Sequence, residues 1–227
     1  YSTNENAGTD TTPHTITLVG TDANGPVTFS GLSGTDAAKF SLNSTTGVLS
    51  FVGQTNYEAA DDAGANHVYD VSVVATDAAG NAVTQAIAIT VNNVNEAPTT
   101  VGIIADKTAV VSQVFTLDTS AYFADVDAGG LTGGVYSATG LGNGLSINAS
   151  TGVISGTALA NAAAAPVVVK FTDAGGLAVS QAAFNLQAVS APAVSGFTVV
   201  DGTGTTTKGT SGDALTFVVT FSEAITV

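Results

Sequence analysis

The chain has 227 residues, 18 of them Asp or Glu and 4 Lys or Arg, with a formal net charge of -14 at pH 7. Because 44% of the residues are hydrophobic, far more than in acidic disordered chains, we expect a folded protein. The scarcity of basic residues excludes nucleic acid and anionic lipid as favoured partners, and the absence of cysteine excludes disulfides and Cys-based zinc sites.

The composition also limits how the protein can be stabilised and how it can be exported. A protein that works outside the cell without disulfides needs another stabilising cross-link, and metal ions are the usual alternative in small domains. No apolar run approaches the roughly 18 residues of a membrane span, so direct membrane insertion is not expected. Nothing resembles a signal peptide, and any export signal is expected to lie outside this piece.

The predicted elements are strands. One helical turn is expected at residues 35–40, with Asp36 as its cap and Phe40 delivered to the core. Farther along, apolar and polar residues alternate at 69–74, 86–91 and 115–118, which is the pattern of half-buried strands. Gly, Asn, Asp, Ser and Thr fill the intervals. The fold class predicted is all-β.

An internal repeat sets the number of domains. Three pairs of segments align at a spacing of about 100 residues, the length of one β-sandwich: 40–50 with 145–155, 76–80 with 172–176, and 22–25 with 125–129. The first pair predicts a hairpin in each domain, where Gly47 or Gly152 supplies a positive φ. Two tandem domains are therefore expected to meet near Pro98.

The C-terminal segment has a different pattern. After the linker-like Pro192, residues 197–227 contain two strand-like runs, too few to close a sandwich. The predicted domains are therefore 1–97, 98–190 and an incomplete third domain at 191–227.

Acidic residues gather at loop-like positions on either side of the run at 93–98. A fold that brought these clusters together would build a cage of oxygen ligands for a hard cation. A lone Asp-x-Asp loop such as Asp125 and Asp127 is more often a solvated turn, because Asp bonds its own backbone. Asp61 and Asp62 are expected to form a charged turn only.

Both domains resemble known repeats. Residues 1–98 resemble a bacterial cadherin-like repeat, through segments 4–7, 22–24, 40–50, 56–58, 75–80 and 93–98. Residues 99–190 resemble a dystroglycan-type cadherin-like repeat, through segments 123–127, 144–147, 150–157 and 171–173. The tail, with residues 221–224, is similar to immunoglobulin-like repeats of giant bacterial adhesins. The resemblance implies Greek-key β-sandwiches arranged end to end in a secreted or bacterial surface protein.

The resemblance also implies calcium at the junction between successive domains. The matching positions are Glu5, Glu58, Asn93, Asn95 and Glu96 below the junction, and Asp125, Asp127 and Asp173 above it. Asn56 and Asn93 stand where the family usually has Asp, so two or three ions are expected, with a Kd on the order of 0.1–1 mM. Asp22, Asn24 and Asp77 match the upper half of such a site in the first domain, and this half-site is expected to be empty or bound to water.

Two functions stay open at this point. The first is a calcium-rigidified extender of a large adhesin, with neighbouring repeats as partners and a monomeric state. The alternative is a calcium-dependent module that binds a cell-surface carbohydrate or protein, for which Tyr1, Tyr57 and Tyr122 lie near the motif loops. Catalysis is not expected, since His14 and His67 lie in no nucleophile or metalloprotease motif.

Overall fold

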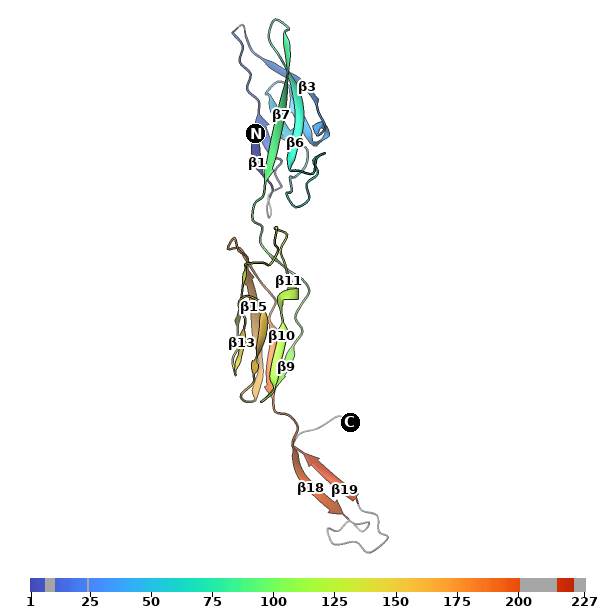
Figure 1. Ribbon diagram of the computed structural model, residues 1–227, viewed down its shortest axis with the longest axis vertical. Helices are drawn as coiled ribbons and strands as arrows, with labels where there is room; N and C mark the ends of the chain where they lie inside the picture. The colour runs from blue at the N-terminus through green and yellow to red at the C-terminus, as the bar shows by residue number, and fades with distance from the viewer. Residues whose placement is uncertain (7–10, 24, 201–215, 223–227) are drawn as a thin grey trace. The chain divides into compact units, whose positions relative to one another are not determined.

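The computed structural model describes residues 1–6, 11–23, 25–200 and 216–222 (Figure 1). Contacts divide the chain into two compact units. The first unit contains Tyr1–Val101, Phe123–Val135 and Phe171–Val179, and the second contains Gly102–Tyr122, Tyr136–Lys170 and Ser180–Val227. The features expected at Ala7, Asn24, Glu223 and Ala224 lie outside the described residues.

Strands dominate the described chain, which confirms the all-β prediction. The helical elements in these ranges are two short 3-10 turns, η1 (Ala37–Lys39) and η2 (Ser120–Tyr122). None of the helical segments described is long and apolar enough to cross a membrane. The predicted turn at 35–40 is confirmed as η1, and it delivers Phe40 to the core with 5% of its surface exposed.

Two sheets formed by the N-terminal hundred residues enclose one core. The larger has the order β1-β7-β6-β3, with β1 (Ser2–Asn4), β7 (Ala82–Asn92), β6 (Val68–Thr76) and β3 (Thr28–Ser33). The smaller has the order β2-β5-β4, with β2 (Thr15–Thr17), β5 (Val48–Phe51) and β4 (Phe40–Asn43). β1 runs parallel to β7, with Asn4 opposite Asn92. Glu5, the next residue, therefore lies beside the end of β7, where the linker at 93–98 begins.

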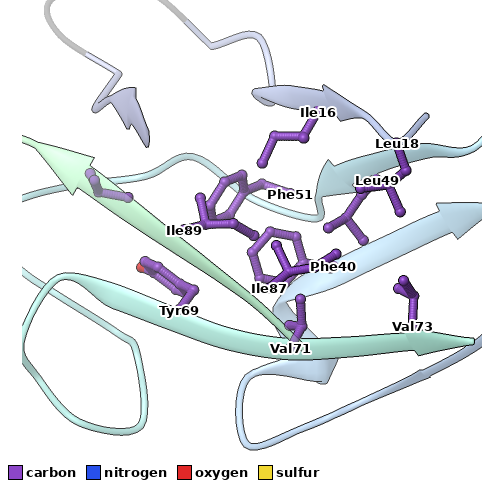
Figure 2. Close-up of a cluster of buried hydrophobic side chains, with 11 residues drawn as sticks. Ile16, Leu18, Phe40, Leu49, Phe51, Tyr69, Val71, Val73, Ile87 and Ile89 are labelled. Atoms are coloured by element: carbon purple, nitrogen blue, oxygen red, sulfur yellow. The ribbon is translucent and has the colours of Figure 1, made fainter. Parts of the chain in front are cut away.

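The core of these sheets follows the alternation in the sequence (Figure 2). Alternate residues are buried at 69–73 of β6 and at 87–91 of β7: Tyr69, Val71, Val73, Ile87, Ile89 and Val91. Leu49 from the opposite sheet and Ile89 have no exposed surface, and each fully buried aliphatic side chain contributes about 1.5–3 kcal/mol. Tyr69 packs edge-on against Phe51, with ring centroids 5.1 Å apart. These contacts fix the first sandwich.

The two aligned hairpins are confirmed as β4–β5 and as β13 (Leu145–Ile147) with β14 (Val153–Thr157). The Oδ1 atom of Asn43 accepts two backbone N–H bonds within its turn, at 3.0 and 3.1 Å. Asn148 Oδ1 does the same at 2.9 and 3.1 Å. Gly47 and Gly152 have φ values of 69° and 71°, as their positions predict. Equal turn chemistry explains why these segments align.

The residues after Pro98 form a second pair of sheets. One has the order β10-β14-β13, where β10 is Val114–Asp118. The other has the order β12-β15-β17-β9, where β16 (Ala178–Ser180) also pairs with β15, and its members are β12 (Val135–Thr139), β15 (Ala162–Thr172), β17 (Phe184–Val189) and β9 (Lys107–Val110). Phe171, Val167, Val169 and Ile154 have no exposed surface.

Two short pairings place the loops that matter for the site. β8 (Thr99–Thr100) pairs with β11 (Phe123–Ala124), with Thr99 opposite Ala124. Asp125, the next residue, therefore begins its loop beside the end of the linker. Asp173 opens the turn between β15 and β16. The C-terminal pair, β18 (Val194–Val200) and β19 (Thr216–Phe221), is antiparallel, and its assignment to a third domain stays a prediction, as do the boundaries of the other two.

Candidate metal centre

Glu5 ties three segments of the first unit together. Its side chain is 4% exposed. Oε2 accepts the backbone N–H of Tyr57 at 2.6 Å, and Oε1 accepts that of Val94 at 2.8 Å. Hydrogen bonds from backbone N–H groups stabilise a buried carboxylate. Glu5 thereby holds the loop at 56–58 and the linker against the end of β1.

Glu5 is also one member of a group of three carboxylates. Ligand oxygens of Glu5, Glu58 and Glu96 lie within 4.8 Å of one another. Asn93 donates from Nδ2 to Glu58 Oε1 at 2.8 Å, so the linker contacts this group at a second point. The pKa of Glu58 is raised, first by desolvation and then by Coulombic repulsion from Glu5 and Asp127. Holding these negative charges close together therefore costs folding free energy.

The remaining predicted ligands lie on two loops that are hydrogen-bonded to the linker. Asp127 Oδ2 accepts the backbone N–H of Glu96 at 2.9 Å, and Asp125 Oδ1 accepts that of Asp127 at 3.1 Å. Asn95 donates from Nδ2 to Asp173 Oδ2 at 3.0 Å. Asp173 is 8% exposed. The linker is thus bonded to loops that lie 31 and 78 residues farther along the chain.

Two carboxylate oxygens of this assembly are buried without a hydrogen-bond partner, Glu96 Oε2 and Asp125 Oδ2. Buried oxygens of this kind need an explanation, since leaving them unpaired costs the desolvation of a charged group. The pKa of Glu96 is raised to about 7, chiefly by desolvation and then by the charges of Glu5, Glu58, Asp127 and Asp125. Desolvation likewise raises the pKa of Asp125.

A cavity of about 320 Å³ opens beside these groups. Its lining includes Tyr57, Asn93, Asn95, Asp125, Asp127 and Asp173. Carboxylate and amide side chains provide most of its polar lining. Their oxygens are the ligand chemistry of hard divalent cations, and calcium accepts 6–8 such oxygens in irregular geometry. The residues present therefore fit calcium, because they offer unpaired oxygens and excess negative charge at one place.

All eight residues predicted from the sequence lie in this unit, and hydrogen bonds or close approach connect each of them to another of the set. Their role as metal ligands stays a prediction. Sequence reasoning missed the contribution of the backbone N–H groups of Tyr57 and Val94 to the position of Glu5. No sequence signal marks them, since any residue type supplies a backbone N–H.

Two smaller expectations were wrong. Asp36 makes no side-chain cap to η1; its oxygens instead accept the backbone N–H groups of Ala63 and Asp70, at 2.7 and 2.8 Å. Asp62 is not part of a solvated turn but is 6% exposed, and it accepts three backbone N–H bonds from its own loop. The short side chain of Asp readily accepts backbone N–H groups nearby, and here these bonds take the place of a helix cap and of a solvated turn. Asp61 is exposed and pairs with Lys39 at 2.6 Å.

Comparison with known proteins finds one family match, which covers less than half of the chain. Residues 97–189 match the family described as "Putative Ig domain". No curated protein sequence matches the chain. Among solved structures, the chain is similar to human CDH23 EC21-23, with 16% identity, 88% of this chain and 69% of that chain covered, and a TM-score of 0.50.

Two further structures have lower scores. Mouse cadherin-23 EC22-24 is 17% identical, with 73% of this chain covered and a TM-score of 0.48. The human desmocollin-1 ectodomain is 17% identical, with 88% of this chain covered and a TM-score of 0.44. The chain spans 53% and 40% of the length of these two. At such identities the likeness to CDH23 shows the fold alone, that of cadherin repeats.

Proposed function

We propose that this chain is a calcium-rigidified segment of a large secreted or surface adhesin of bacterial origin. The observation that carries the proposal is the pair of buried, unpaired oxygens, Glu96 Oε2 and Asp125 Oδ2, within a group of six carboxylates. Such an arrangement is costly unless a cation accompanies it. The motifs described for residues 1–98 and for the tail support the bacterial adhesin assignment.

The residues that would hold two or three calcium ions are the eight named above. When bound, the cations would supply positive charge that offsets the repulsion among Glu5, Glu58 and Glu96. Glu5 orients the loop at 56–58 and the linker in advance, through its two backbone hydrogen bonds. Asn95 and the backbone N–H of Glu96 keep the linker on the Asp173 and Asp127 loops. The linker is therefore prepared to become rigid.

The extender is favoured over the carbohydrate-binding alternative by the state of Tyr57. A saccharide platform needs an aromatic face open to solvent. The ring of Tyr57 is half-buried and stacks on His67, with centroids 3.8 Å apart and an interplanar angle of 16°. One of its faces is thereby occupied. Neighbouring repeats of the same polypeptide are the partners that the proposal names, in an extracellular, non-enzymatic role.

Thermal unfolding under a calcium titration tests the proposal. With calcium at about 100 times Kd, binding to the folded state adds about 2.7 kcal/mol per independent site, and for a chain of this size each kcal/mol raises Tm by about 2–4 °C. The Glu96→Gln, Asp127→Asn double variant is expected to lose most of this rise. Asp70→Asn, which removes an exposed charge from β6, is the matched control and should keep it. A wild-type Tm equal in calcium and in EGTA would sink the proposal.

A further inference from the structure

Two turns of the chain share their backbone hydrogen bonds but differ in what surrounds the aspartate. The turn after β6 starts at Asp77, and the turn after β15 starts at Asp173. Asp77 donates its backbone N–H to the carbonyl of Asn81 at 3.0 Å, and Asp173 donates to that of Leu177 at 2.8 Å. In each turn the Oδ1 atom accepts the backbone N–H four residues later, at 2.8 Å in both. The two turns are therefore matched up to this point.

The second carboxylate oxygen distinguishes them. Asp77 Oδ2 accepts a bond from Nδ2 of Asn81, at 2.8 Å, within its own turn. In the other turn the residue at that position is Leu177, whose side chain offers no donor. Asp173 Oδ2 instead accepts Nδ2 of Asn95, which comes from the linker, at 3.0 Å. One turn satisfies its own aspartate, and the other leaves an oxygen for a residue from elsewhere.

The space beside the aspartate also differs between the two turns, and again only the Asp173 turn has room for the linker. A Cβ atom placed on Gly175 would overlap the amide group of Asn95. The matching position in the first turn is occupied by Ala79, which already has a Cβ. The backbone of Gly175 is outside the positive-φ region, so conformational freedom does not explain the glycine. The missing side chain is what allows the linker to reach Asp173.

We infer that Gly175 and Leu177 make the Asp173 turn a receptor for the linker amide of Asn95, and that Ala79 and Asn81 close the Asp77 turn to a linker of this kind. The inference deepens the proposed function and rests on it for its calcium readout alone. Gly175 and Leu177 act as positioning residues, since neither would touch the ion. They determine which of the two repeats accepts a preceding linker at this turn.

The test converts the open turn into the closed type with Gly175→Ala, Leu177→Asn. The alanine displaces the Asn95 amide, and the new asparagine competes for Asp173 Oδ2. Leu177 is 42% exposed and Gly175 is exposed, so the core is not involved. Single Leu177→Asn is the milder second variant, without the steric change. Gly53→Ala is the control, at an exposed glycine with nothing within 4 Å of an added Cβ.

Hydrogen exchange of the Glu96 amide in EGTA is the first readout, because this amide is bonded to Asp127 only while the linker is in place. Exchange is expected to become about tenfold faster in the double variant, and less so in Leu177→Asn, as loss of one hydrogen bond to a charged group implies. Calcium affinity measured by calorimetry is expected to fall about tenfold, the lower end for an outer-shell partner. The control should change neither quantity.

The possible results separate the two claims. Unchanged Glu96 exchange in both turn variants would overturn the inference, whatever calcium does. If the wild type takes up no calcium while exchange accelerates as expected, the proposed function fails and the receptor role of the Asp173 turn stands. Faster exchange with weaker calcium binding supports both.

Discussion

Replacing Glu96 by Gln is expected to change the stability of the protein in opposite directions with and without calcium. The pKa of the Glu96 carboxyl is about 7, against an ordinary value of 4.5. Each pKa unit corresponds to about 1.36 kcal/mol, so ionised Glu96 costs the metal-free fold at most roughly 3 kcal/mol. Because the side chain is partly exposed, solvent screening reduces this to about 1–2 kcal/mol.

The sign with pH follows from the same values. Below pH 4.5 the carboxyl is protonated in both the folded and the unfolded chain, and the penalty is absent. Between pH 4.5 and about 7 the unfolded chain ionises first, so the metal-free protein loses stability as the pH rises. Above about pH 7 the loss is complete. Gln carries no charge and is expected to remove this slope.

Urea unfolding in EGTA at about pH 5 and pH 8 measures the effect. At pH 8 Glu96→Gln should be more stable than the wild type by about 1–2 kcal/mol, and near pH 5 the difference should shrink. If calcium binds as proposed, the order should reverse in saturating calcium, because the variant lacks one of the proposed charged ligands. Asp70→Asn is the control for loss of a charge outside the group. A Glu96→Gln protein that is less stable than the wild type in EGTA at pH 8 would refute the reasoning.

Three further outcomes are expected from unfolding titrations. Asp62→Ala should destabilise the fold by about 2 kcal/mol, because three backbone N–H groups lose their acceptor. These bonds lower the pKa of Asp62 despite its desolvation, so the stability that Asp62 contributes should be lost as the pH falls. Equal stability of the variant and the wild type at neutral pH would contradict this prediction. Ala65→Gly should stabilise by about 0.5 kcal/mol, since Ala65 has a φ of 48°, and a loss of stability would count against strain there. Leu49→Ala should cost about 3 kcal/mol through a cavity at a fully buried site, whereas a cost below about 1 kcal/mol would show that the core collapses around it.

Much of the fold could be predicted from local patterns of apolar and polar residues. Alternation at 69–74 and 86–91 predicts β6 and β7, and the buried members are the expected ones. The aligned hairpins were predictable because Asn43 and Gly47, or Asn148 and Gly152, form their turns with residues only a few positions away. Asp36 was misassigned as a cap for the converse reason, since its true partners lie 27 and 34 residues away.

The acidic side chains that compose the candidate centre are determined by the sequence, as are the carboxylate and amide oxygens that suit a hard cation. Their energetic state is decided by tertiary structure. Glu5 becomes a buried anchor because strand β1 runs beside β7 and brings it to Tyr57 and Val94, 52 and 89 residues away. The high pKa of Glu96 likewise arises from desolvation and from charges on distant segments. Local sequence specifies the types of oxygen ligand, whereas burial and long-range pairing specify which of these oxygens remain without a hydrogen-bond partner.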